Sequence, residues 1–212
     1  MTRLMIWTTA FLALGPLAAS AQESTAKPAA RSAAALPVTP AGSSVSIEQI
    51  GSFNTANVTD SGSGSQLTLI QRGDEQAANV RLSGAGNEGA LTQYGLGNRA
   101  SISISGVANF FKLGQSGSAA VGSTGNAVQL SQIGLNNFAV QSQTGSGNSM
   151  SLLQSGDDNA ATMQQDGQHN LMELAQYGNE NFAALSQFGF EAPPVIVTQT
   201  GGMSVEITQT GE

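Results

Sequence analysis

Side chains that could do chemistry are few in this chain, and their spacing does not assemble a catalytic or metal site. His169 is the only histidine, and no partner for a catalytic triad or a metal shell accompanies it. The absence of cysteine excludes disulfides, thiolate chemistry and zinc fingers. Asp157, Asp158 and Asn159 could hold calcium, but the Gly-Gly-x-Gly-x-Asp repeat of calcium-binding β-rolls is absent. We therefore interpret these acidic residues as solvated turns and expect no bound metal.

Gly84, Gly86 and Gly89 have the spacing of the dinucleotide-binding fingerprint Gly-x-Gly-x-x-Gly. That fingerprint requires a strand before it and a helix after it, whereas here a strand is expected to follow. A polysaccharide lyase or hydrolase would need carboxylates or arginines clustered on one outer face, and the outward positions of this chain carry mostly Ser, Thr, Ala and Gln. We expect no enzyme, no catalytic residue, no cofactor and no small-molecule substrate.

The charge balance argues against nucleic acid as a partner. The chain of 212 residues has 7 basic and 14 acidic residues, a formal net charge of −7, and no Lys or Arg from Leu113 to Glu212. Nucleic-acid binding depends on clustered Lys and Arg that release counterions. Charged residues make up 10% of the chain, against about 25% in an average globular protein. The composition is therefore unlike that of an ordinary cytosolic enzyme.

The amino-terminal segment, residues 1–21, has the three parts of a secretory signal peptide. Arg3 precedes the uncharged run Leu4–Leu17, and residues 19–21 (Ala-Ser-Ala) form a small-residue cleavage site. The run is shorter than the about 20 apolar residues that a membrane span needs. We predict export with cleavage after residue 21, followed by a flexible Ala-, Ser- and Pro-rich leader over residues 22–42.

A Gln-x-Gly repeat organises the rest of the chain. The repeated glutamines are Gln49, Gln71, Gln93 and Gln115, which are 22 residues apart, and then Gln132, Gln143, Gln154, Gln165, Gln176 and Gln187, which are 11 apart. Several copies extend to Gln-x-Gly-x-x-Asn-x-Ala. Degenerate copies lie between the 22-spaced glutamines, with Asp60, Leu82 and Ile104 in the glutamine position. The unit is therefore 11 residues long, and two units make a 22-residue turn.

Hydrophobicity alternates within each unit. The positions seven and nine residues after each glutamine position, such as Val128 and Leu130, are apolar in every copy except for Gly89 and Gln141, and the positions between them are mostly polar. This alternation predicts strands with one buried face. We therefore predict an all-β fold, a β-solenoid over residues 43–212 with two short strands per 22-residue turn and about 15 strands.

The predicted ladder has two irregularities. The 17-residue step from Gln115 to Gln132 predicts a loop over residues 116–125. The 12-residue step from Gln187 to Gln199 contains Pro193 and Pro194, which we place at a strand start, where proline is tolerated.

The conserved parity of the unit also turns amides inward, on the same side as the apolar residues. A buried amide is costly unless it is hydrogen bonded, and identical amides stacked one turn apart can bond to each other as ladders. Asparagine could instead cap its own turn. The residues that we predict to form a structural amide ladder are Gln49, Asn54, Gln71, Gln93, Asn98, Gln115, Gln132, Asn137, Gln143, Asn148, Gln154, Asn159, Gln165, Asn170, Gln176, Asn181 and Gln187.

Both ends of the predicted solenoid keep the inward pattern. The first strand, Ser43–Gln49, and the last, Met203–Gln209, conform to it, and neither carries a recognisable polar cap. Soluble solenoids close their ends with polar capping repeats, and sheets guard open edges with charge, proline or bulges. We therefore expect the molecule to add to itself end to end.

Tandem Gln-x-Gly-x-x-Asn-x-Ala units after a signal peptide resemble the curlin repeat of bacterial curli fibre subunits. The resemblance covers roughly Ser43 to Gly211. It implies a functional amyloid that is secreted through a dedicated outer-membrane curli pore, associates with itself and with other curlin subunits, and forms an extracellular adhesive and biofilm fibre on the bacterial surface. The upstream Ser of the family motif is patchy here, and the leader is Ala/Pro-rich rather than Gly-rich, so both the major-subunit and the nucleator types stay open.

A different class of function also remains open at this stage. A monomeric secreted β-solenoid could act as an adhesin or other surface-binding protein. A regular outward row of threonines would favour it, but Thr55, Thr59, Thr68 and Thr92 form no continuous rank.

Overall fold

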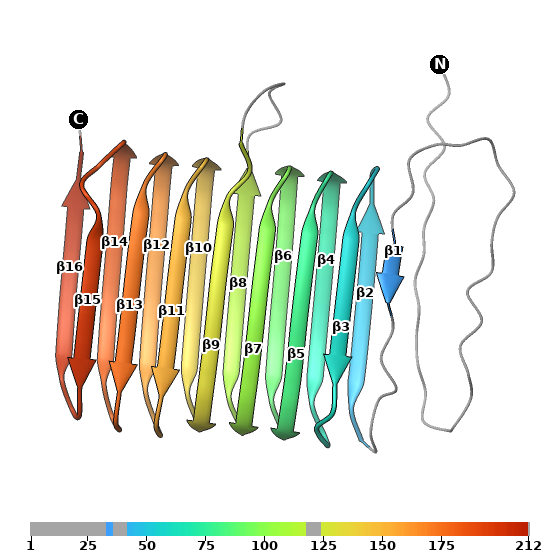
Figure 1. Ribbon diagram of the computed structural model, residues 1–212, viewed down its shortest axis with the longest axis horizontal. Coiled ribbons are helices and arrows are strands. Elements are labelled where there is room, and N and C mark those ends of the chain that lie inside the picture. Colours follow the sequence, from blue (N-terminus) through green and yellow to red (C-terminus); the bar gives the residue numbers. More distant parts are fainter. Residues whose placement is uncertain (1–32, 36–41, 118–123, 212) are drawn as a thin grey trace, which may run out of the picture.

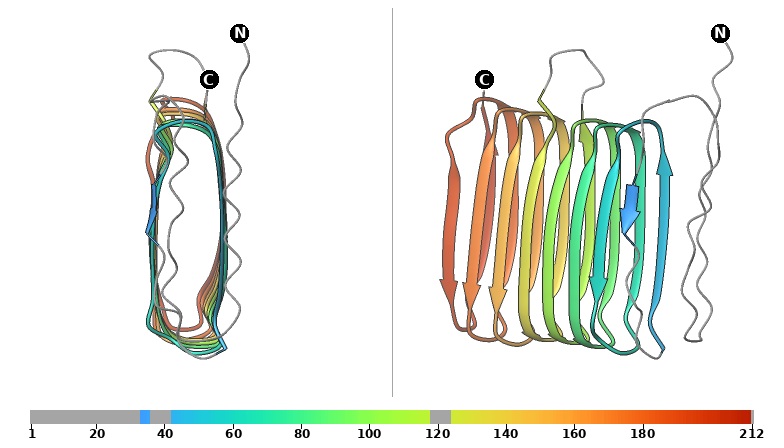
Figure 2. Two further views of the ribbon diagram at one scale, coloured as in Figure 1. Left: turned by 90° about the vertical axis from the view of Figure 1, so that its right-hand side faces the viewer. Right: turned by 45° about the vertical axis from the view of Figure 1, so that its right-hand side comes forward.

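The computed structural model describes residues 33–35, 42–117 and 124–211, and these form a flattened tube of stacked turns (Figure 1; Figure 2). Each turn contributes one strand to each of two facing sheets. The strands are β1 (Ala33–Ala35), β2 (Ser44–Ile50), β3 (Thr55–Asp60), β4 (Gln66–Asp74), β5 (Ala77–Ala85), β6 (Glu88–Leu96), β7 (Arg99–Val107), β8 (Phe110–Gly117), β9 (Ala127–Leu135), β10 (Phe138–Ser146), β11 (Ser149–Ser155), β12 (Ala160–Gln168), β13 (Leu171–Tyr177), β14 (Phe182–Phe190), β15 (Val195–Thr200) and β16 (Ser204–Thr210).

The strands alternate strictly between the two sheets. The even sheet runs from β2 to β16 through the even-numbered strands, and the odd sheet runs from β1 to β15 through the odd-numbered strands. Each has eight strands, and every pairing is parallel. The predicted all-β solenoid with two strands per turn is therefore confirmed.

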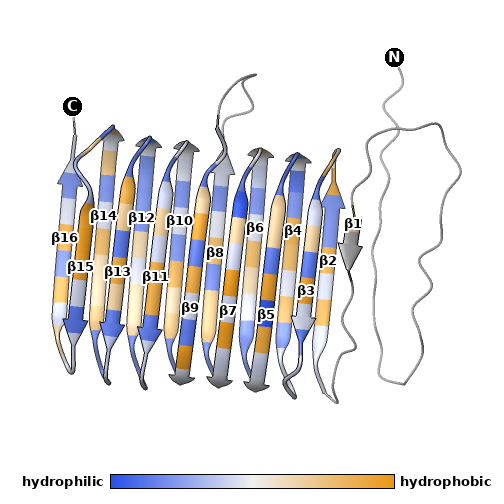
Figure 3. Cartoon of the chain, in the orientation of Figure 1, coloured by the Kyte–Doolittle hydropathy of each residue, from blue (hydrophilic) through white to orange (hydrophobic). Residues whose placement is uncertain are grey.

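The core is a thin layer between the inner faces of the two sheets. Positions seven and nine of the unit are buried throughout, as at Leu69, Leu91 and Met163, which are all 0% exposed. The alternation of apolar and polar residues is visible as bands across the strands (Figure 3). Gly89 fits the same layer for a steric reason: a Cβ on it would lie 2.1 Å from the Phe111 ring of the next turn. The missing side chain at Gly89 accommodates the phenyl ring.

Strand register follows the repeat length. Most neighbouring strands pair residues that are 22 apart, such as Gln49 with Gln71. Across the 17-residue step the offset is 28, with Gln115 beside Gln143, so the six extra residues leave the register of the flanking strands intact. Pro193 and Pro194 directly precede β15, and this single extra residue shifts its offset to 23, with Gln176 beside Gln199.

Three sequence predictions concern segments that are partly outside the described residues. The signal peptide, residues 1–21, lies wholly outside them. Of the leader, residues 22–42, the structure describes a three-residue strand, β1, which the sequence did not predict and which pairs with β3. Of the loop over residues 116–125, the part 118–123 lies outside, and residues 116 and 117 belong to β8. No helix long and apolar enough to span a membrane occurs in the described segments.

Candidate functional site: stacked amides and open strand edges

The 17 amide side chains singled out in the sequence all lie in the interior. Each glutamine is at the inward end of a strand and each asparagine directly precedes the next strand, so the amides line the two narrow rims of the tube. Their exposed fractions are between 0% and 9%, with the 9% at Gln49 in the first described turn. Outward glutamines such as Gln129 and Gln164 are exposed. The parity of the unit therefore separates inward from outward amides.

One glutamine column runs the whole length of the even sheet. Its members are Gln49, Gln71, Gln93, Gln115, Gln143, Gln165, Gln187 and Gln209. The Nε2 group of Gln49 donates to Oε1 of Gln71 at 2.7 Å, and the same bond recurs at every step with donor–acceptor distances of 2.8 to 3.4 Å. Every bond points the same way, from the amino-terminal turn to the carboxy-terminal one. The column is a continuous, directional ladder.

The odd sheet carries a shorter glutamine column. It begins at Gln132 and continues through Gln154 and Gln176 to Gln199, with distances of 2.8, 2.9 and 2.8 Å. The residue before Gln132 in this column is Ile104, which has no amide to donate. Consistent with this, Oε1 of Gln132 is buried without a hydrogen-bond partner in the described residues.

The asparagines combine the two roles that the sequence left open, because they bond within their own turn and to both neighbouring turns. Asn148 donates from Nδ2 to the Thr144 carbonyl of its own turn at 2.9 Å and to the Gly167 carbonyl of the next turn at 2.9 Å. Its Oδ1 accepts from the backbone N–H of Asn170 at 3.1 Å. On the opposite rim the side chains also bond to each other, as from Asn159 Nδ2 to Asn137 Oδ1 at 3.0 Å. Local caps and inter-turn ladders are thus one network.

Further buried amides belong to this network but were missed in the sequence: Gln76, Asn87, Asn109, Asn126, Gln199 and Gln209. Asn87 and Asn109 stand five residues after Leu82 and Ile104, in degenerate copies that lack the glutamine. Counting five residues on from the degenerate positions finds both of them. Asn126 is displaced from that count by the six-residue insertion, and only the 28-residue strand register reveals it.

All five buried side-chain atoms that lack a hydrogen-bond partner within the described residues lie where the repeat departs from its pattern. They are Asp60 Oδ2, Ser65 Oγ, Gln76 Oε1, Gln132 Oε1 and Gln141 Oε1. A buried polar group without a partner costs about 1–3 kcal/mol. Regular copies of the repeat avoid this cost, because the next turn supplies the partner.

The glycine of Gln-x-Gly is required by the distance between turns. Gly145 has φ of +106°, and a Cβ on it would lie 1.8 Å from the carbonyl oxygen of Gly167 one turn away. The same carbonyl accepts a hydrogen bond from Asn148 Nδ2 at 2.9 Å. A side chain at this position would therefore both strain the backbone and push apart the turns that the amides join.

The end turns have open strand edges. Among the described residues, β16 pairs only with β14, β15 only with β13, and β2 only with β4. On the odd sheet, β1 covers three residues of β3, from Thr55 to Asn57. At the carboxy-terminal end, Val205 and Ile207 are half-buried and pack against the core. Both ends therefore present backbone groups and apolar side chains of the kind that a further strand would cover.

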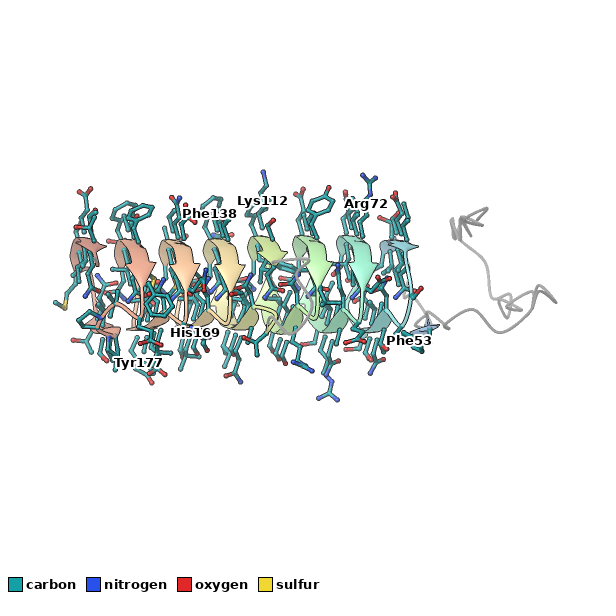
Figure 4. All side chains as sticks on the ribbon, turned by 90° about the horizontal axis from the view of Figure 1, so that it is seen from above. Phe53, Arg72, Lys112, Phe138, His169 and Tyr177 are labelled. Atoms are coloured by element: carbon teal, nitrogen blue, oxygen red, sulfur yellow. The ribbon has the colours of Figure 1, made fainter. Side chains whose placement is uncertain are left out.

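The ionisable groups lie on the outside and form no reactive cluster. Figure 4 shows Arg72, Lys112 and Phe138 projecting from the even sheet and Tyr177 from the opposite side. Arg72 donates to Glu48 Oε1 at 2.8 Å, and this hydrogen bond and the negative charge of Glu48 raise the pKa of Arg72. In the described segments, no three His, Cys, Asp or Glu side chains are grouped so that they could hold a metal ion.

Comparison with known proteins supports the repeat assignment. No curated protein and no solved structure matched this chain. One family did match, the Curlin associated repeat, over residues 156–189. This stretch begins at the glycine of one unit, contains β12 and β13, and ends within β14, so it includes complete 11-residue units with their inward amides. Residues 156–189 are therefore a Curlin associated repeat, folded as turns of a β-solenoid with stacked Gln and Asn ladders.

Proposed function

We propose that this chain is a structural subunit of an extracellular curli-type functional amyloid fibre, which assembles end to end by strand addition and serves adhesion and the biofilm matrix. The observation that carries the proposal is the pair of open edges at β15 and β16, next to a glutamine ladder that ends in Gln209. A second copy placed on these edges would continue both sheets and the ladder, without a new kind of contact.

The internal contacts support the same proposal. Each turn is held to the next by parallel strand pairs, stacked amides and a shared apolar layer, so contact between copies would repeat what already joins turns within one copy. Curlin repeats belong to a structural family, which agrees with a role without catalysis. On this proposal, the partners are further copies of the chain, other curlin subunits and the outer-membrane curli secretion pore, and the site of action is the bacterial cell surface.

The test is polymerisation of the chain from Gln22 to Glu212. We expect thioflavin-T-positive fibres whose diffraction has a meridional reflection near 4.8 Å, the strand spacing along the fibre axis. Electron microscopy of the same sample should show unbranched fibres. A soluble, dye-negative monomer that persists for days would contradict the fibre proposal and favour the monomeric adhesin.

A further inference from the structure

The two terminal strands of the even sheet carry the same inward side chains, although they lie at opposite ends of the molecule. Residues 44–49 and 204–209 both read Ser-Val-x-Ile-x-Gln, with Val, Ile and Gln facing the core. No other strand of the even sheet has this combination: the corresponding inward pairs are Leu67 and Leu69, Gly89 and Leu91, Phe111 and Leu113, Ala139 and Gln141, Ala161 and Met163, and Ala183 and Leu185.

The hydrogen-bonding groups at these two ends are complementary as well. In the even ladder each Nε2 donates toward the carboxy-terminal end. Gln209 therefore presents an amide donor at the last described turn, and Gln49 presents Oε1 as an acceptor at the first. Because the bond is directional, a carboxy-terminal end fits an amino-terminal end, and two like ends would bring donor to donor or acceptor to acceptor.

The strand β1 fixes the rotational phase of such a contact. The sheets alternate along the chain, so the strand that follows β16 in a continued helix must lie beside β15 in the odd sheet. An incoming copy begins with β1, which already belongs to the odd sheet, and β2 then follows in the even sheet. With β1 included, each copy supplies eight strands to each sheet, and successive copies need no rotation about the tube axis.

We infer that successive copies join with β16 of one copy paired in register to β2 of the next, Ser204 beside Ser44 and Gln209 beside Gln49, while β1 of the incoming copy lies beside β15. This inference rests on the proposed fibre and specifies its subunit junction. Val205 then stacks on Val45 and Ile207 on Ile47, which keeps the width of the core constant across the junction. The Gln209 Nε2 group donates to Gln49 Oε1 and extends the ladder from copy to copy.

The competing arrangement rotates each copy by half a turn. It places β2 beside β15 and β3 beside β16, so that Ser204 lies beside Thr55 and Gln209 faces Asp60. The side chains of β15 tolerate both arrangements, because Val195, Val197 and Gln199 would also stack well on β2. The rotated junction, however, requires β1 to leave β3 and replaces an amide pair with an amide facing a carboxylate. The match of β16 to β2 and the position of β1 therefore favour the unrotated junction.

Cysteine cross-linking distinguishes the two junctions, because the native chain contains no cysteine. One double variant carries Ser44→Cys and Ser204→Cys, and the matched control carries Thr55→Cys and Ser204→Cys; all three positions are outward and exposed. Residues paired in register on neighbouring strands lie about 4.8 Å apart, within the range of about 4.4–6.8 Å between the Cα atoms of a disulfide. Fibres of each variant, verified by diffraction and microscopy, are oxidised with diamide and dissolved under non-reducing conditions.

We expect a ladder of covalent multimers from the Ser44/Ser204 variant and essentially none from the Thr55/Ser204 control. Multimers from the control alone would overturn the inference in favour of the rotated junction, and fibres with no multimers from either variant would place the junction elsewhere. In both cases the fibre proposal would stand. Failure of the unsubstituted chain to form fibres would overturn the fibre proposal and the inference together.

A second measurement avoids substitutions altogether. Fibres grown from an equal mixture of ¹⁵N-labelled and ¹³C-labelled unsubstituted chains show in solid-state NMR only those heteronuclear contacts that join different copies. We expect contacts between Val205 and Val45 and between Gln209 and Gln49. Contacts of Val205 with Ala56, or of Gln209 with Asp60, would overturn the inference even if the cysteine variants failed to polymerise.

Discussion

At the residue scale, the same side-chain type has opposite roles on adjacent positions of one strand. Gln165 is 0% exposed and lies in the middle of the even ladder, where it accepts from Gln143 and donates to Gln187, each at 2.9 Å. Gln164 is exposed on the outer face of β12. The difference between the two comes entirely from the two-residue period of a strand.

This pair gives a matched test of the ladder. We expect Gln165→Ala to destabilise the protein by about 3 kcal/mol, because it removes two hydrogen bonds and leaves the Nε2 group of Gln143 and the Oε1 atom of Gln187 without those partners. Gln164→Ala should change stability by less than about 0.5 kcal/mol, as surface substitutions usually do. Denaturant titration of both variants measures the difference. Equal losses would mean that the amide bonds contribute little beyond what the strands provide.

At the element scale, the length of a ladder depends on where the repeat changes. The odd-sheet ladder starts at Gln132 because Ile104 precedes it. Its first member has an unpartnered Oε1 atom within the described residues, whereas interior members such as Gln154 are bonded on both sides. A ladder can therefore be shortened from its end at less cost than it can be interrupted.

We predict that Gln132→Leu costs about 1 kcal/mol, roughly one hydrogen bond. The number of unpartnered acceptors stays the same, since that of Gln132 is lost and that of Gln154 replaces it, and the new leucine packs on Ile104. Gln154→Leu should cost at least about 2 kcal/mol more, because it removes two ladder bonds and separates Gln132 from Gln176. Thermal unfolding of the two variants under identical conditions ranks them. The reverse order would contradict the end effect.

Strand positions, the buried face and 17 inward amides could be predicted from the sequence because the 11-residue period is strict between Gln132 and Gln187. The regular copies need only parity to be placed. Asn126 could not be found in this way, since its place depends on pairing across an insertion. The strand β1 has no alternating pattern of its own, because its three residues are all alanine, and it forms beside an edge that β3 provides.

At the scale of the whole molecule, every turn depends on its neighbours. A turn on its own cannot bury its apolar face, and repeats of this kind become stable only when several stack. We therefore predict that polymerisation shows a lag phase, which preformed seeds of the same protein remove. Thioflavin-T kinetics over a concentration series, with and without seeds, measure this. Lag-free growth at low concentration that seeds do not accelerate would contradict it.

Charge at the junction should control the rate of elongation. In the inferred register, Glu206 lies opposite Ser46 of the next copy and diagonal to its Glu48, and like charges in neighbouring strands repel. We predict that Glu206→Gln accelerates seeded elongation on the order of twofold at low salt, and that the gain decreases as salt screens the charges.

Glu173→Gln is the matched control, since it also removes one exposed negative charge but lies within the odd sheet, beside Ser151 and Ile196 of the same copy. Its elongation rate should stay close to that of the native chain. If both variants accelerate elongation equally, the cause is the net charge of the molecule and not the charge at the junction.

The direction of the glutamine ladders gives the molecule an electrical axis. An amide group has a dipole of about 3.5 D, and in both glutamine columns the side-chain dipoles point along the tube in one sense. Backbone groups of successive residues in a strand point to opposite neighbours and largely cancel, whereas the glutamine dipoles add. A fibre built from copies joined head to tail would accumulate this moment with length. Suspended fibres would then align in an electric field, and their two ends, one rich in donors and one in acceptors, would attract counterions of opposite sign.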